Sequence, residues 1–276
     1  VSDGRRSDVT DGSGRFLLDD LPPGPTTVYV EKGSFTVEFE VTIVANDVTE
    51  VSEDTCLERD SVHIAVITGM YDDIGAILTA MTIPYTSFSG IESAEYVDFL
   101  RDPAAMAEFD IIFINCGQHT EWWPHAGEVG NNLRNYVMAG GNLYASDWAY
   151  YMLEVSFPDL LDYYGDDSTA GAAAIGDPGE HWAEVIDPYM QALLGTSVAE
   201  LNFDYNAWAI PVSPGPDTRV LVRGTARIEG SSATVIDSPL TVRSDPGGGV
   251  IFTAFHNESQ ATMDMETMLR EIVLSL

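Results

Sequence analysis

Alternating hydrophobic and polar residues over positions 1–55 predict a region made of β-strands. The clearest run is "VEFEVTI", where Val37, Phe39, Val41 and Ile43 share one face of a strand and the residues between them face water. Asp-Gly, Pro-Pro-Gly and Lys-Gly steps indicate turns between the runs. We therefore expect short antiparallel strands in this region.

The pattern changes at Val62, where short apolar runs begin to alternate with helical segments. The expected strands include 62–68, 109–117, 142–148, 218–224, 239–245 and 249–255. Helical spacing lies between them at 72–81, 93–102 and 130–141, and again at the end of the chain. This order is typical of an α/β fold, and we predict a flavodoxin-like, doubly wound parallel sheet.

The same pattern predicts how the chain is divided. Residues 1–55 form the β-region, 56–61 a short polar linker, and 62–276 the α/β domain. Residues 155–215 interrupt the alternation with proline- and glycine-rich sequence, so we expect an insertion that caps the sheet.

Composition narrows the class of protein. Of 276 residues 45% are hydrophobic, which is enough to bury a core. The 44 acidic against 12 basic residues give a formal net charge of −32, which argues against nucleic acid and anionic lipid as partners. No apolar run approaches the length of a membrane span. Calcium is a candidate ion for so acidic a chain, although the densest acidic cluster, 162–168, is no complete calcium loop.

Two cysteines, Cys56 and Cys116, stand apart and outside any Cys-x-x-Cys motif, which excludes a zinc ribbon. They are either joined by a disulfide, in a protein outside the cytoplasm, or present as free thiols.

Polar residues follow the ends of four predicted strands, at 68–73, 115–125, 146–151 and 256–259. Ligands of open parallel sheets bind outside the carboxyl ends of the strands. We therefore expect these four segments to meet at one edge of the sheet.

The stretch "TDGSGRFLLDDLPPGPTTVYVEKGSF", Thr10 to Phe35, resembles the carboxypeptidase-regulatory-like β-sandwich family. The strands that usually open that family are absent here, so the resemblance implies a partial β-sandwich. An incomplete sandwich leaves an unpaired edge. A strand-donating partner or a second copy of the chain would fill that edge by strand addition.

Residues 62–154 and 249–276 resemble the class I glutamine-amidotransferase-like superfamily, nearest its trehalose-utilisation-like branch. The resemblance is carried by "FDIIFINCG", "YVMAGGNLYASDW" and "FTAFHNES". It implies a cysteine nucleophile after a central strand and a late His-x-Glu motif. His256 and Glu258 match the late motif, whereas Ser146 or Asp147 stands where the family has its cysteine.

The missing cysteine favours an extracytoplasmic binding or assembly protein without catalytic activity, in the extracellular or periplasmic space. The first alternative is a hydrolase that uses Ser146 or Asp147 with His256 and Glu258. The second is a structural subunit that polymerises by β-strand addition.

Aromatic and polar side chains near the predicted strand ends suit a ligand of mixed polarity, such as a glycan. The predicted ligand-binding residues are Tyr71, Gln118, His119, Trp122, Trp123 and Trp148. A metal site would draw on His119, His125, Asp147 and His256, but the spacing of the first two is undiagnostic. We therefore predict no metal site and no cofactor, apart from the candidate calcium.

Overall fold

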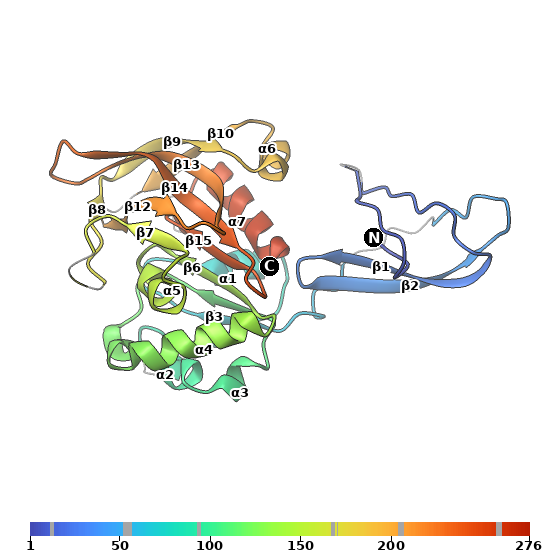
Figure 1. Ribbon diagram of the computed structural model, residues 1–276, viewed down its shortest axis with the longest axis horizontal. Helices are drawn as coiled ribbons and strands as arrows, with labels where there is room; N and C mark the ends of the chain where they lie inside the picture. Colours follow the sequence, from blue (N-terminus) through green and yellow to red (C-terminus); the bar gives the residue numbers. More distant parts are fainter. Residues whose placement is uncertain are drawn as a thin grey trace. The chain divides into compact units, whose positions relative to one another are not determined.

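The computed structural model describes residues 1–11, 14–51, 57–92, 95–166, 169, 171–203, 207–257 and 261–276. The chain forms two compact units, residues 1–62 and residues 63–274 (Figure 1). The first unit contains two strands, and the second contains the large sheet and the described helices. The second unit carries the site described below.

The first unit is built on a β-hairpin. Strand β1 (Gly24–Lys32) pairs antiparallel with β2 (Phe35–Ile43), and Gly33 supplies the left-handed φ of 56° that the turn between them requires. The residues of β2 alternate between more buried and exposed, as the sequence pattern predicts. In the described part of this unit the named strands form one two-stranded sheet.

A nine-stranded sheet organises the second unit, in the order β10-β9-β13-β14-β15-β6-β5-β3-β4. One half is parallel and consists of β4 (Thr86–Phe88), β3 (Ile64–Ile67), β5 (Ile111–Ile114), β6 (Asn142–Ser146) and β15 (Val250–Thr253). The other half is antiparallel and consists of β14 (Thr234–Ser244), β13 (Arg219–Arg227), β9 (Gly179–Val185) and β10 (Val198–Phe203).

Helices cover both faces of this sheet (Figure 1). On one side lie α2 (Glu95–Leu100), α3 (Pro103–Met106), α4 (Ala126–Met138) and α5 (Tyr150–Ser156). The closing helix α7 (Met263–Ser275) lies on the other side and buries Met265, Leu269 and Ile272 at helical spacing. The remaining helices are α1 (Ile74–Ala80) and α6 (Pro188–Leu194). The predicted flavodoxin-like α/β fold is confirmed.

The segment 155–215 differs from its predicted role as a cap beside the sheet. Its strands β9 and β10 extend the sheet itself at one edge. Two further pairs flank the sheet: β7 (Leu161–Tyr163) with β12 (Pro211–Pro214), and β8 (Ile175–Gly176) with β11 (Trp208–Ala209). Among the described helices, none has both the length and the apolar character needed to span a bilayer.

Candidate active site

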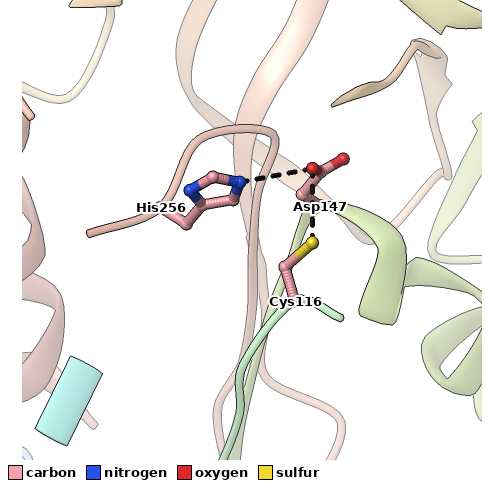
Figure 2. A group of neighbouring side chains, drawn as sticks. All are labelled: Cys116, Asp147 and His256. Atoms are coloured by element: carbon pink, nitrogen blue, oxygen red, sulfur yellow. Dashed lines mark hydrogen bonds and ion pairs between the residues drawn. The ribbon is translucent and has the colours of Figure 1, made fainter. Parts of the chain in front are cut away.

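Three side chains from different strand ends meet at the carboxyl edge of the parallel strands (Figure 2). Cys116 follows β5, Asp147 follows β6 directly, and His256 follows β15. The Cys116 thiol donates a hydrogen bond to Asp147 Oδ2 at 3.5 Å, and His256 Nε2 lies 3.4 Å from the same oxygen. Because β5, β6 and β15 are parallel neighbours, segments far apart in the sequence converge here, as the strand-end rule predicts.

Asp147 occupies a sharp turn between strand and helix. Its φ of 44° lies in the left-handed region, at the point where β6 gives way to the 3₁₀ turn η2 (Asp147–Ala149) and then α5. Few residues other than glycine adopt this conformation. The turn presents the Asp147 side chain at the edge of the sheet, in the way that a nucleophile elbow presents its reactive residue.

Ser146 has a different environment from Asp147. It is fully buried, and its hydroxyl donates to Asp72 Oδ2 at 2.5 Å. Of the two residues that the sequence offers at this turn, the geometry therefore places Asp147 beside His256, whereas the Ser146 proton is held by Asp72. Glu258, the other half of the late motif, lies outside the described residues.

Asp72 is a buried carboxylate that the sequence did not single out. Its Oδ1 accepts the backbone N–H of Asn257 at 2.9 Å, and Asn257 also donates through its side chain to the carbonyl of Asp73 at 2.7 Å. These bonds fix the segment that carries His256 against the loop after β3. The stretch 68–73 is predicted to reach this edge, but sequence alone does not tell which of its two aspartates turns inward.

The loops after β3 and β5 touch backbone to backbone beneath Cys116. A Cβ on Gly69 would lie 1.8 Å from the carbonyl oxygen of Cys116, and Gly117 has a φ of 94°. Both positions therefore require glycine, which fixes the place of the thiol.

Burial governs the charges at this site. It raises the pKa of Asp72 and of Asp147, and the positive charge of a protonated His256 opposes this rise in both. Burial also raises the pKa of the Cys116 thiol well above its ordinary value, and the nearby Asp147 carboxylate adds to this rise. At neutral pH Cys116 is therefore a thiol, which is a poor nucleophile by itself.

An aromatic pocket of about 160 Å³ lies beside these residues in the chain. Four of the predicted ligand-binding residues line it, namely Gln118, Trp122, Trp123 and Trp148. The other two, Tyr71 and His119, are not among its lining residues, and His119 Nδ1 lies 3.6 Å from Glu121 Oε1. Trp122 and Trp123 each pack on Tyr151, with ring centroids 5.1 and 5.5 Å apart.

The histidines considered for a metal site are separated. His125 Nδ1 lies 3.8 Å from Glu128 Oε2, and neither it nor His119 belongs to the group formed by Asp147 and His256. Cys116, which the sequence treats as a disulfide candidate, belongs to that group instead. It is a buried free thiol, and Cys56 lies outside the described residues.

Neither a family model nor a curated protein matches the sequence. Solved structures do match the fold. A GMP synthase component from Thermoplasma acidophilum aligns with 78% of this chain and 94% of its own, at 10% identity and a TM-score of 0.51. The chain has the fold of the class I glutamine amidotransferases.

Two more distant matches carry related names. A glutamine amidotransferase from Thermotoga maritima has 7% identity and a TM-score of 0.43, with 77% of this chain and 81% of that chain covered. The glutaminase domain of Trypanosoma brucei CTPS, with bound acivicin, has 12% identity and a TM-score of 0.46, with 78% and 93% covered.

These matches correct the leading interpretation of the sequence. A binding or assembly protein without catalytic activity was favoured because the turn after β6 lacks a cysteine. The matched structures are described as synthase, amidotransferase and glutaminase proteins, and they fit the alternative of a hydrolase better. The absent cysteine was misleading because the turn carries another reactive group, the Asp147 carboxylate, in contact with an imidazole.

Proposed function

We propose that this chain is a hydrolase whose reaction centre is the pair Asp147 and His256. One observation carries the proposal: the residue at the left-handed turn after β6 is a buried carboxylate, 3.4 Å from an imidazole nitrogen. A carboxylate that contacts histidine orients the ring and stabilises its protonated form. The pair is thus equipped to move a proton during bond cleavage.

Water is the nucleophile that fits this pair best. The Cys116 thiol is held protonated by burial, and the Ser146 hydroxyl donates to Asp72. A water molecule activated at the pair would attack the acyl carbon of the substrate and lose its proton to the pair. The acyl bond to the leaving group then breaks, and the proton passes to the leaving nitrogen or oxygen.

Carboxamides and esters are the proposed substrate class. The resemblance of 62–154 and 249–276 to the glutamine-amidotransferase-like superfamily supports an acyl substrate, and the shared fold agrees with it. The pocket beside the site supports a substrate with a flat or partly apolar group, because its walls include Trp122, Trp123 and Trp148.

The test is a hydrolysis screen with matched variants. The parent chain is assayed against a panel of carboxamides, including glutamine, and of esters. Asp147→Asn and His256→Ala are expected to lower kcat/KM at least about 100-fold, since proton transfer of this kind contributes ~10²–10⁴-fold. The controls are Asp237→Asn and His63→Ala, because these side chains are 69% and 74% exposed.

Two results would contradict the proposal. One is the absence of hydrolysis by the parent over the whole panel. The other is hydrolysis that survives unchanged in both Asp147→Asn and His256→Ala. Equal losses in the control variants would show that the assay reports on folding rather than on the site.

Other expectations from the sequence stay predictions. They are the trehalose-utilisation-like branch, the partial carboxypeptidase-regulatory-like sandwich in 1–55, and a location outside the cytoplasm. So do a glycan ligand, bound calcium, and an oligomer or strand-donating partner at the first unit. The net charge of −32 supports the calcium prediction, and the single hairpin of the first unit is compatible with strand addition.

A further inference from the structure

We propose that Cys116, Asp147 and His256 together bind a zinc ion. The three side chains supply a sulfur, a carboxylate oxygen and an imidazole nitrogen, and these donor atoms all lie within 4.8 Å of one another. Figure 2 shows them pointing toward one common position from three strand ends. Zinc is the ion that proteins bind with this mixture of donors.

The separations between the donor atoms match those around a tetrahedral zinc. Zinc lies about 2.3 Å from sulfur and about 2.0–2.2 Å from nitrogen and oxygen, so tetrahedral angles put neighbouring donors about 3.3–3.6 Å apart. The structure has 3.5 Å from Cys116 Sγ to Asp147 Oδ2 and 3.4 Å from that oxygen to His256 Nε2. An ion would therefore require little movement of these side chains.

The surroundings hold two of the proposed ligands in place. Asp147 Oδ1 accepts the backbone N–H of Ala209 at 2.7 Å, which aims Oδ2 at the other two donors. The residue after His256, Asn257, is fixed by Asp72. Hydrogen bonds of this kind, one step removed from the ion, orient metal ligands in proteins.

Charge and donor type also favour zinc. Asp72 and Asp147 are buried carboxyl groups at one strand edge, and burial disfavours their charged forms. A divalent cation would reverse this effect and would also stabilise the thiolate of Cys116. Calcium and magnesium prefer shells made of oxygen, so the sulfur and nitrogen donors select against them.

Three protein ligands leave the fourth position of a tetrahedral ion open. This is the arrangement of catalytic zinc sites, where a bound water has its pKa lowered to about 7. If the proposed function holds, the ion supplies the activated water for acyl cleavage. Zinc binding itself does not depend on that function.

The experiment measures metal binding by the full chain after treatment with a chelator. Zinc is titrated in competition with a chromophoric chelator, and cobalt(II) is then added in place of zinc to record its absorption spectrum. We expect one tight zinc per chain. With cobalt we expect the intense visible bands of a tetrahedral ion and a sulfur-to-cobalt charge-transfer band in the near ultraviolet.

Matched variants locate the ion. Cys116→Ser, Asp147→Asn and His256→Ala are each expected to weaken zinc binding more than the ~10–100-fold that loss of an outer partner costs. Cys116→Ser is also expected to remove the charge-transfer band. Cys56→Ser, Asp237→Asn and His63→Ala are the controls and should keep both properties. They also report the weak background binding expected of a chain with net charge −32.

The outcomes separate the two proposals. Tight zinc binding with a thiolate band, but without hydrolysis, supports the zinc site and contradicts the hydrolase. Hydrolysis that persists in a chain that binds no zinc supports the hydrolase and overturns the zinc site. A cobalt spectrum of the parent without a thiolate band also overturns the site, and this measurement does not depend on the folding of any variant.

Discussion

Asp147 shows how much one residue can change the chemistry of a fold. In a left-handed conformation a residue other than glycine is strained by about 1–3 kcal/mol, and such strain persists where the surroundings impose it. Here the surroundings are the N–H of Ala209, the thiol of Cys116 and the imidazole of His256. A carboxylate in this place binds a metal ion or moves a proton, where a cysteine would form a covalent bond.

Glu154 gives a prediction at the same scale. Burial, and then the charge of Asp166, raise its pKa from 4.5 to about 7. Its folded-state pKa lies above the unfolded value, so the folded chain binds the proton more tightly. This contribution to stability is fully present below pH 4.5 and is lost as the pH rises through about 7.

Glu154→Gln should therefore reduce the fall in stability between about pH 4.5 and about pH 8. At about pH 8 we expect the variant to be more stable than the parent by about 1 kcal/mol, a value discounted for partial exposure to solvent. Denaturant unfolding of the parent, the variant and the exposed control Glu92→Gln at several pH values measures the effect. Identical pH profiles for the parent and Glu154→Gln would contradict it.

At the scale of elements, the site depends on how closely the loops after β3 and β5 approach. A new Cβ at Gly69 would overlap the carbonyl oxygen of Cys116, at 1.8 Å, so the two loops would have to separate. We expect Gly69→Ala to lower the free energy of unfolding by at least about 2 kcal/mol, as overpacking against a backbone does. Chemical denaturation measures the loss.

Gly127→Ala is the matched control for this prediction. Gly127 lies within α4, and a Cβ there would have no atom within 4 Å. Alanine is the better helix former, so this variant should be as stable as the parent or more stable, by about 0.5 kcal/mol. If Gly69→Ala unfolds at the same denaturant concentration as the parent, the loops are not in contact as described.

At the scale of the whole molecule, the sequence predicts the fold well and the site in part. The fully apolar β3 and β5 and the helical spacing of α7 identify an α/β sheet, and the strand-end rule predicts where segments meet. The sequence does not predict that β9 and β10 join the sheet, because a strand pattern does not name its partner. Nor does it predict the roles of Cys116 and Asp72, since orientation at a strand end depends on tertiary contacts.

The central claim is that Asp147 and His256, 109 positions apart in the printed sequence, act as one unit. A double-mutant cycle on kcat/KM tests it most directly, with Asp147→Asn, His256→Ala and the double variant assayed on the best substrate of the screen. Residues that act as a unit give strongly non-additive losses. The double variant should therefore be about as slow as the slower single variant. Losses that multiply, or single variants as fast as the parent, would contradict the claim.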